Sequence, residues 1–386
     1  MPGKKKIAII GTVGLPATYS GFEILADNLV KQLGDKYDIT VYCSKRQFSK
    51  ESRQSTYQSA TLKYLPFKTY GFQGVLYNSI ANFSAMFKAD ILLVFGVAGA
   101  WVFPFVKKLT NKKIIVSIDN SEWKRDNAGT LTKRYFRWSE KIARKYAHAD
   151  IADNESLLNP AAIRNGSISA LIESGANHKA SVRPTAADKE VYPFLAKPYA
   201  LKICSVEPIT NVHLVLELFS TMRKYKLVVV GNWKKSPYGI SLLEKYAGFE
   251  NLVLLDPVQD QHMLDLIKGN AYIYIHGHSA GCSNASLVEA MYLGLPVIAF
   301  DIHGNRSTTE NKALYFTTNA DLKSLIENTR IGELKEIGLL MKEIAYRTNS
   351  WSIIAEKYNK VFKKISGMEK LTSIGSRLNE LPEKTV

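Results

Sequence analysis

Short apolar runs alternate with amphipathic stretches along most of the chain. The apolar runs are rich in Val, Ile and Leu, which is typical of strands buried in a parallel sheet. The stretches between them place apolar residues three and four positions apart, which favours helices that cover such a sheet. The pattern therefore predicts an α/β protein with doubly wound parallel sheets.

The alternation predicts strands and helices at defined positions. In the first half the predicted strands are Ile7–Ile10, Ile39–Cys43, Leu62–Leu65, Ile91–Phe95, Ile114–Ile118, Asp150–Ala152 and Ser169–Ile172, and the predicted helices are Gly21–Leu33, Phe72–Phe87, Leu131–Ala147 and Glu155–Ile163. In the second half the predicted strands are Leu201–Val206, Leu227–Gly231, Leu252–Leu255, Ala271–Ile275 and Val297–Phe300, and the predicted helices are Val212–Arg223, Ile240–Ala247, Met263–Lys268 and Ala285–Leu293.

A chain of 386 residues is too long for one growing hydrophobic core, so two domains are expected. The alternation lapses before residue 200, and we place a linker near Pro193–Pro198 because prolines interrupt the pattern there. The predicted domains are 1–196 and 197–350, each Rossmann-like. Residues 351–366 form a last amphipathic helix, and the polar, aperiodic residues 367–386 form a loose tail.

The composition is that of a soluble globular protein, with 46% hydrophobic and 22% charged residues. The net charge is +16, and it is uneven: residues 1–200 hold 29 basic and 16 acidic residues, whereas residues 201–386 hold 22 and 19. A nucleic-acid binder usually concentrates its charge in a helix or tail. The diluted excess of +13 in the first half instead indicates a phosphate-rich partner, either an anionic bilayer or a phosphorylated substrate.

Three cysteines far apart, Cys43, Cys204 and Cys282, indicate a reduced, cytoplasmic setting. The first residues show no apolar signal-peptide core. The longest uncharged apolar stretch, Ile91–Val106, is interrupted by glycine and proline and is shorter than the ~20 residues of a spanning helix. No transmembrane segment is predicted.

A glycine-containing loop, 11–23, joins the first predicted strand to the first predicted helix. Gly14 and Gly21 would let backbone N–H groups approach an anion beside a helix N-terminus. The spacing is not G-x-G-x-x-G and Cys43, not an acid, ends the second strand, so a dehydrogenase fits poorly. The alternative is a tight turn without a ligand.

A second glycine- and serine-rich loop follows the predicted strand that ends near Ile275. Gly281, Ser283 and Asn284 precede a predicted helix whose N-terminus suits a diphosphate. Glu289 lies about one and a half turns into that helix, where a carboxylate can accept two ribose hydroxyls. The alternative, a surface glutamate, is disfavoured because the neighbouring helix residues are apolar.

His276 and His278 are predicted to point to opposite faces of an extended segment, so they do not share a metal. The favoured interpretation is a hydrogen-bonded histidine at a strand end. Neither H-E-x-x-H nor paired cysteines nor D-x-D occurs, and no metal site is predicted.

A charged segment follows the strand that ends at Ile118. Asp119, Glu122 and Asp126 are candidates for acid, base or acceptor-binding roles. Lys124 and Arg125 are candidates for phosphate contacts. The alternative is a solvated charged loop. In the second domain, the strand-end residues Gly231, Asn232 and Trp233 are candidates for stacking on and hydrogen bonding to a nucleobase.

Aromatic and basic residues also adjoin the stretch from 91 to 106 in the manner of an interfacial membrane anchor. The alternative is a buried strand and helix with a solvated basic end. The residues concerned are Trp101, Phe103, Phe105, Lys107, Lys108, Lys112 and Lys113.

At these motifs the chain resembles glycosyltransferases of the two-domain GT-B fold, family 4, and more narrowly bacterial rhamnosyltransferases of capsule and cell-wall polysaccharide synthesis, whose first domain is called DUF1972. The resemblance reaches to about residue 366, and its most specific stretch is 274–301. The other matching segments are 7–23, 122–126, 151–154, 206–211, 231–239 and 255–257.

The resemblance implies two domains facing a central cleft, with a nucleotide-sugar, dTDP-L-rhamnose, bound mainly by the second. It implies retaining transfer without a metal or other cofactor onto a saccharide linked to polyprenyl diphosphate, at the inner face of the cell membrane. It also implies that the helix 351–366 crosses back to the first domain. The enzyme would be cytoplasmic, peripheral on an anionic membrane surface, and not a nucleic-acid binder.

The sequence departs from the resemblance at several positions. The branch usually has arginine where this chain has Ser205, and the wider family has lysine at Asn211 and glutamate at Gly281. The opening loop has Val13 where arginine is frequent. Two alternatives to the transferase therefore stay open: a non-catalytic, glycosyltransferase-like partner in a polysaccharide-assembly complex and, on charge alone, a nucleic-acid binder.

Overall fold

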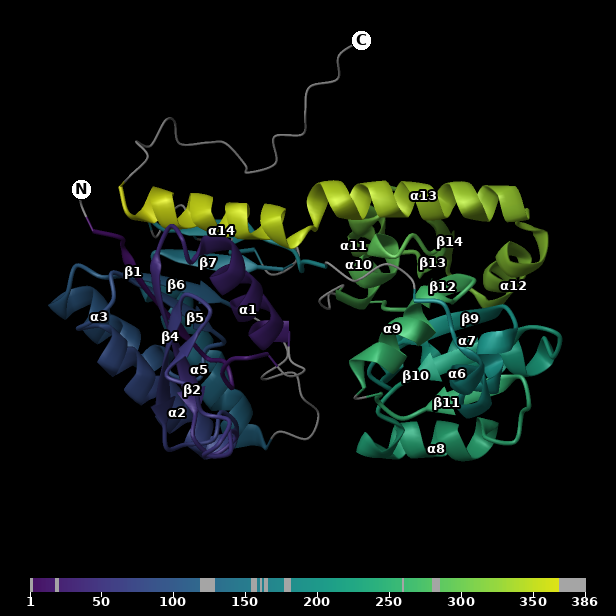
Figure 1. The fold of residues 1–386 in the computed structure, drawn as a ribbon, viewed down its shortest axis with the longest axis horizontal. Helices are drawn as coiled ribbons and strands as arrows, with labels where there is room; N and C mark the ends of the chain where they lie inside the picture. The colour runs from purple at the N-terminus through teal and green to yellow at the C-terminus, as the bar shows by residue number, and fades with distance from the viewer. Residues whose placement is uncertain are drawn as a thin grey trace, which may run out of the picture. The chain divides into compact units, whose positions relative to one another are not determined.

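The computed structural model describes residues 3–17, 21–118, 129–153, 158–159, 162, 166–176, 182–258, 260–279 and 285–367. The chain divides into two compact units (Figure 1). The first unit contains Met1–Glu173 and Trp351–Val386, and the second contains Ser174–Ser350. Each unit holds its own sheet, so the predicted α/β fold with two Rossmann-like sheets is confirmed.

The sheet of the first unit has the order β3-β4-β2-β1-β5-β6-β7-β8, and all neighbouring pairs are parallel except β3 with β4. Its central strand β1 is buried along four of its five residues, as the apolar run predicts. The strands are β1 Lys6–Ile10, β2 Asp38–Ser44, β3 Thr56–Tyr57, β4 Ala60–Leu65, β5 Ile91–Phe95, β6 Lys113–Ser117, β7 Ala149–Ala152 and β8 Ile168–Leu171.

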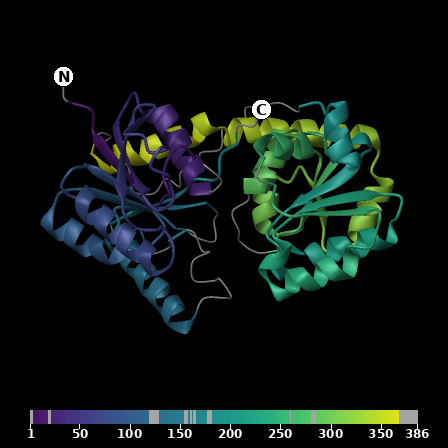
Figure 2. The ribbon, with the colours of Figure 1, turned by 60° about the horizontal axis from the view of Figure 1, so that its bottom comes forward.

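Helices cover both faces of this sheet (Figure 2). One face packs against α1 (Gly21–Leu33) and α14 (Trp351–Ile365). The other face packs against α2, the short helix η1, α3 and α5. Their bounds are α2 Gly71–Ala85, η1 Ala100–Val102, α3 Phe103–Leu109 and α5 Thr130–Tyr146.

The sheet of the second unit is parallel throughout, in the order β11-β10-β9-β12-β13-β14. Its strands are β9 Tyr199–Ile203, β10 Lys226–Val230, β11 Leu252–Leu255, β12 Ile273–His276, β13 Val297–Phe300 and β14 Leu314–Phe316. The helices are α6 Ala186–Val191, η4 Pro193–Ala196, η5 Pro208–Thr210, α7 Val212–Thr221, η6 Trp233–Lys235, α8 Pro237–Tyr246, α9 Gln261–Gly269, α10 Ala285–Tyr292, α11 His303–Thr308, α12 Asn319–Asn328 and α13 Ile331–Thr348.

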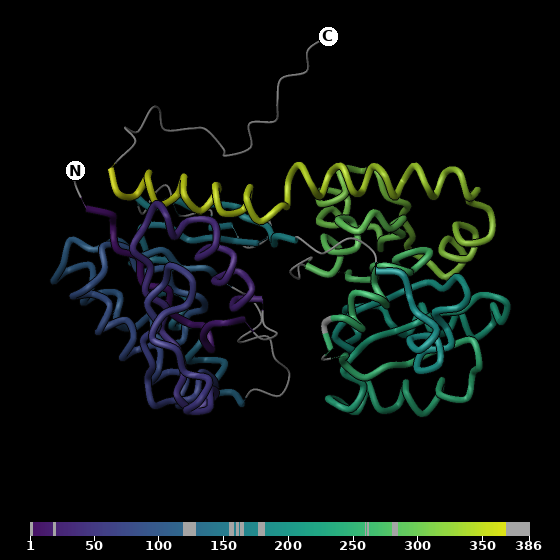
Figure 3. Tube along the Cα trace, viewed as in Figure 1, coloured from purple at the N-terminus to yellow at the C-terminus, as the bar shows by residue number. Residues whose placement is uncertain are grey.

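The last described helix, α14, returns to the first unit and lies beside α1 (Figure 3). Ile354 and Phe362 are buried in the core shared with α1. The Tyr37 hydroxyl donates to Asn359 Oδ1 over 2.7 Å. These contacts bury the apolar stripe that the sequence shows in Trp351–Ile365.

The boundary between the units differs from the predicted one at 196. Residues 174–196 belong to the second unit because their backbone and side chains contact it. Ala176 N–H donates to the carbonyl of Asn349, and Phe194 packs against Tyr199. The prolines interrupt the periodicity there without separating the units.

Most predicted elements are present with ends shifted by a few residues. The predicted helix Glu155–Ile163 lies almost wholly outside the described residues. The sequence pattern missed the strands β3 and β14 and the helices α6 and α11 to α13.

Candidate active site

Ligands of doubly wound sheets bind at the carboxyl ends of the strands. Of the predicted site residues, the structure describes Gly14, Gly21, Gly231, Asn232, Trp233 and Glu289. The remaining ones lie outside the described residues: Asp119, Glu122, Lys124, Arg125, Asp126, Gly281, Ser283 and Asn284.

Glu289 on α10 forms an ion pair with Lys268 on α9, with 2.5 Å between Oε2 and Nζ. The Lys268 side chain is 8% exposed and the Glu289 side chain 23% exposed. α10 follows the loop after β12, and its other face buries Leu287 and Met291 in the core. The pair therefore holds a partly exposed carboxylate in a fixed place on α10, as a ligand for hydroxyl groups requires.

The two histidines of the second loop do not point to opposite faces, so that prediction is wrong. The rings of His276 and His278 stack with centroids 4.5 Å apart and planes 15° from parallel. The chain leaves the strand conformation at Gly277, so strict alternation ends there. Burial, with a smaller effect of Lys202, lowers the pKa of His278 to about 3.

Lys202 in β9 was not predicted as a site residue. It is 1% exposed, and its Nζ has no hydrogen-bond partner in the described part of the chain. The sequence signal that marks it is a single charge inside the apolar strand segment Tyr199–Ile203.

Trp233 was predicted to stack on a nucleobase, and the structure contradicts this. The side chain is 1% exposed and packs in the core beside α7 and α8. Its indole N–H donates to the carbonyl of Leu255 over 2.8 Å. A ring with both faces covered cannot stack on a ligand, so Trp233 is a core residue.

Asn232 and Gly231, which precede Trp233, also contact other parts of the second unit. The Oδ1 atom of Asn232 accepts from the N–H of Val206 over 2.8 Å. A Cβ atom at Gly231 would lie 2.7 Å from the Val206 side chain. These contacts fix the turn after β10 and account for both residue types.

The first glycine loop is closed by contacts of its own. A Cβ atom at Gly14 would lie 2.8 Å from that of Cys43, and φ at Gly14 is +140°. The N–H of Val13 donates to Glu23 Oε1 over 2.7 Å. Glu23 is 3% exposed, and its Oε2 has no hydrogen-bond partner within the described residues. A buried carboxylate suits a hydroxyl donor and disfavours a diphosphate at this loop, while open space surrounds Gly21.

The residues predicted as a membrane anchor are only partly exposed. Phe103 is fully buried, and the Trp101 indole N–H donates to Ser79 Oγ, whereas Phe105 is 45% exposed. Helices α2, α3 and α5, which cover one face of the first sheet, together expose many apolar side chains. They are Phe72, Leu76 and Ile80 on α2, Phe87 after it, Phe105 and Leu109 on α3, and Leu131 and Trp138 on α5.

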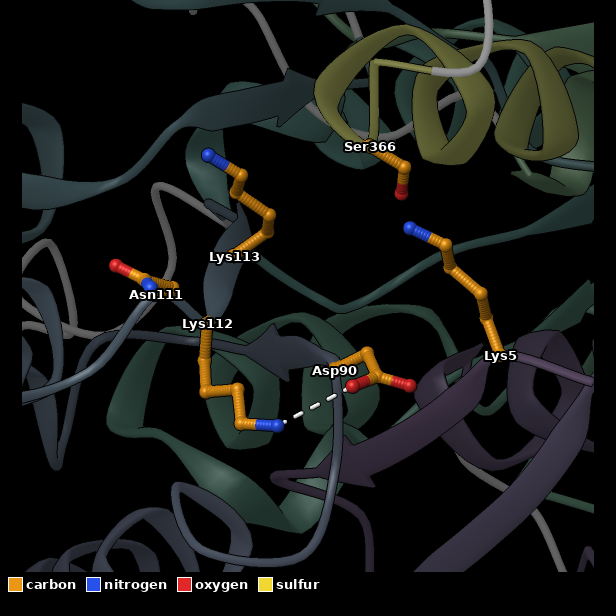
Figure 4. A pocket seen from close by; sticks show the side chains of 6 residues that line it. All are labelled: Lys5, Asp90, Asn111, Lys112, Lys113 and Ser366. Atoms are coloured by element: carbon orange, nitrogen blue, oxygen red, sulfur yellow. Dashed lines mark hydrogen bonds and ion pairs between the residues drawn. The ribbon is translucent and has the colours of Figure 1, made fainter. Parts of the chain in front are cut away.

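A cavity of about 540 Å³ lies at the amino edge of the first sheet, where β1, β5 and β6 begin (Figure 4). Lys112 points toward Asp90, with 3.2 Å between Nζ and Oδ1. Three lysines and one aspartate line the cavity, so it favours anions. Its lining residues are Lys5, Asp90, Asn111, Lys112, Lys113 and Ser366.

Neither a metal-binding cluster nor a membrane-spanning helix is found among the described residues. They contain no group of three or more His, Cys, Asp or Glu side chains placed to hold a metal ion. No helix among them is long and apolar enough to cross a membrane.

Two family models match the chain. The model "Domain of unknown function (DUF1972)" matches residues 4–162, and the model "Glycosyl transferases group 1" matches residues 186–332. The second match includes Lys202, Lys268 and Glu289. A search of curated proteins returned no match.

Solved structures share the fold over most of the chain. Sucrose-phosphate synthase from Thermosynechococcus elongatus is 14% identical, with a TM-score of 0.74 over 95% of this chain and 100% of that one. Anabaena Alr3699/HepE in complex with UDP and glucose is 13% identical, with a TM-score of 0.69 over 93% and 100%. An E. coli structure described as trehalose-6-phosphate bound with UDP-2-fluoro glucose is 10% identical, with a TM-score of 0.66 over 94% and 99%. The family matches and this fold together support a GT-B glycosyltransferase.

Proposed function

We propose that this GT-B glycosyltransferase moves a rhamnosyl group from dTDP-L-rhamnose to a saccharide on polyprenyl diphosphate, in surface-polysaccharide synthesis. The observation that carries the proposal is the Lys268–Glu289 pair, which joins α9 and α10 inside the segment matched by glycosyl transferases group 1. The similar solved chains that hold UDP, glucose or UDP-glucose support a nucleotide-sugar donor. The DUF1972 match and the motifs of residues 274–301 support the rhamnosyl branch.

In this proposal Glu289 accepts hydrogen bonds from the ribose hydroxyls of the donor, and Lys268 holds the carboxylate in position. The acceptor hydroxyl oxygen forms a bond to the anomeric carbon as the bond from that carbon to the diphosphate breaks. The acceptor attacks from the side that the diphosphate leaves and gives its proton to the diphosphate, so configuration is retained. No metal takes part, so protein groups must meet the charge that develops on the diphosphate.

The acceptor-side residues of the proposal are Asp119, Glu122 and Asp126, with Lys124 and Arg125 on phosphate. All five follow β6 in sequence and lie outside the described residues. Carboxylates there would bind or deprotonate the acceptor hydroxyl.

The proposal also includes an anionic membrane surface, which the face formed by α2, α3 and α5 would meet from the cytoplasm. The apolar side chains exposed on these helices stand among exposed basic ones, a combination that favours the interface of an anionic bilayer. The basic residues include Lys88, Lys107, Lys108, Arg134, Lys141 and Lys145.

The experiment combines nucleotide binding with transfer. We expect dTDP or UDP to raise the melting temperature, and purified protein with dTDP-L-rhamnose to add a deoxyhexose to lipid-linked saccharides in membrane extracts, detected by mass spectrometry. Glu289→Ala should weaken nucleotide binding about 10-fold or more because it removes a charge-assisted contact.

Glu244→Ala, at an exposed position of α8, is the matched control and should bind nucleotide as the wild type does. Absence of any nucleotide-induced shift would refute the donor site. Transfer from another nucleotide-sugar would keep the glycosyltransferase and refute rhamnose.

A non-catalytic glycosyltransferase-like partner is the second candidate. It is favoured by the uncharged residues Ser205 and Asn211 at positions that often carry the positive charges for the diphosphate. Nucleotide binding without transfer to any lipid-linked acceptor would support this alternative.

A further inference from the structure

A lysine in a buried strand normally has an anionic partner, and Lys202 has none within the described residues. It lies in β9, between Leu201 and Ile203, and is 1% exposed. Its Nζ makes no hydrogen bond there. Burying an ammonium group without a partner is strongly unfavourable, and burial accordingly lowers the pKa of Lys202.

The described groups near Nζ include a backbone carbonyl, that of Thr210, and the side chains of Cys204 and His278. A Cβ atom at Gly277 would lie 2.7 Å from Nζ. Lys202 lowers the pKa of His278, after burial, and burial is also the main cause of the lowered pKa of His213 on α7. Cys204 in the same segment is a thiol, and residues 277–286 contain no acid. The protein around Lys202 thus offers positive potential and no anion to match it.

Lys202 lies near the carboxyl end of β9, at the edge of the second sheet where the proposed donor site lies. β9 pairs with β12, and the loop after β12 leads to α10, which carries Glu289. Nζ is covered in this structure, so a ligand at the strand end would reach it only after the chain around Gly277, which has no side chain to displace, shifts. A ligand with two phosphate groups would supply the negative charge that the fold leaves out.

Two other lysines of the second unit have acidic partners. Lys268 pairs with Glu289, and Lys234 pairs with Asp256 over 3.3 Å. The neutral Asn211 donates from Nδ2 to the carbonyl of Gly277 over 3.0 Å. It therefore braces the loop above Lys202 and adds no charge.

We propose that Lys202 is a further binding residue of the donor site, and that its ammonium group pairs with the diphosphate of the nucleotide. The inference rests on the proposed function for its ligand and adds the residue that meets the leaving group. Lys202 would take the role that the chain lacks at Ser205 and Asn211. A side chain at position 277 is excluded in any case, since its Cβ atom would lie 2.4 Å from the carbonyl oxygen of Thr210 and 2.7 Å from Nζ.

The test measures how much the second phosphate contributes to binding. Calorimetry gives the affinities of the wild type and Lys202→Met for UDP against UMP, and for dTDP against dTMP. We expect the diphosphate to bind the wild type about 10- to 100-fold more tightly than the monophosphate, and the variant to reduce that ratio to about 3-fold or less. Methionine matches the lysine stem, so the apo variant should melt at the same or a higher temperature.

Lys245→Met, on the exposed surface of α8, is the matched control and should keep the wild-type ratio. An unchanged ratio in Lys202→Met would overturn the inference and leave the donor site intact. A variant that loses monophosphate and diphosphate binding equally would also overturn it, since Lys202 would then support the fold of the site. If the wild type binds none of the four nucleotides, the proposed function itself fails.

Discussion

The loops after β1 in the first unit and after β12 in the second are both glycine-containing connections from a central strand to a helix. In the first, a buried carboxylate, Glu23, takes the N–H of Val13, and Gly14 packs against Cys43. In the second, Lys202 lies buried beneath Gly277 without a partner among the described residues. One strand end therefore carries buried negative charge and the other buried positive charge.

The difference shows that glycine at a strand end does not by itself make an anion site. An anion needs donors or cations that the fold has left unpaired, and of the described parts of these two loops only the one after β12 lies beside such a cation, Lys202. The overall charge is distributed in the opposite way. The sequence of the first unit has 32 basic and 18 acidic residues, whereas that of the second has 19 and 17. The excess basic charge of the first unit and the buried Lys202 of the second unit thus suit different ligands.

The largest expected effect is the loss of stability on substituting Gly11, in the first glycine loop. Its φ is +100°, and a Cβ atom there would lie 2.1 Å from the carbonyl oxygen of Phe95. Gly11→Ala should lower the free energy of unfolding by about 3 kcal/mol or more, measured by urea denaturation.

Gly304→Ala on α11, where no atom would lie within 4 Å, is the control and should stay within about 0.5 kcal/mol of the wild type. A small effect at Gly11 would mean that the loop adjusts freely, and its contrast with the second loop would disappear.

The charge of the first unit can be tested on vesicles. Arg134→Glu with Lys141→Glu on α5 should weaken co-sedimentation with vesicles containing phosphatidylserine about 10-fold or more, since each basic residue near such a surface contributes about 1 kcal/mol. The pair Lys224→Glu with Lys245→Glu, exposed in the second unit, should have little effect. Equal losses for both pairs, or equal binding to neutral vesicles, would contradict a specific anionic face.

The smallest expected effect concerns His148 near the basic amino edge of the first sheet. Burial, with Lys113 and Lys107, lowers its pKa from 6.5 to about 4, and Nδ1 accepts from the N–H of Ile114. The unfolded chain therefore binds a proton at a higher pH than the folded one. The stability due to the neutral ring is complete above about pH 6.5 and is lost as the pH falls toward 4.

Between pH 7 and pH 5 this loss should be about 1 kcal/mol, after allowance for solvent screening. His148→Gln should reduce the slope of stability against pH, measured by urea denaturation. Asn328→Gln, at an exposed position without a titratable group, is the control and should leave the slope unchanged. If His148→Gln has no effect, the acid sensitivity belongs to other groups, such as His278 in the second unit.

Much of the fold could be predicted because its signal is local. The helix Gly21–Leu33 and the strands Ile91–Phe95 and Val297–Phe300 begin and end where the apolar pattern predicts. The errors lie where distant contacts decide. Residues 174–196 contain prolines typical of a linker, yet Ala176 bonds to Asn349 far along the chain.

The candidate site was less predictable for the same reason. Trp233 follows a strand, as a stacking residue would, but the carbonyl of Leu255 and the core beside α7 hold it. Glu289 was predicted from its place in a motif, whereas its pairing with Lys268 depends on how α9 and α10 pack. No local pattern distinguishes a paired from an unpaired charge.

The sequence by itself determined the α/β class, the two Rossmann-like sheets and the unequal division of charge, because periodicity and composition need only neighbouring residues. The tertiary structure alone decided which polar groups are already satisfied. Glu23 accepts a hydrogen bond from the N–H of Val13, and Lys268 forms an ion pair with Glu289. Lys202 has no anionic partner among the described residues. Whether a buried charge has a partner depends on contacts between segments far apart in the chain, which no local pattern encodes.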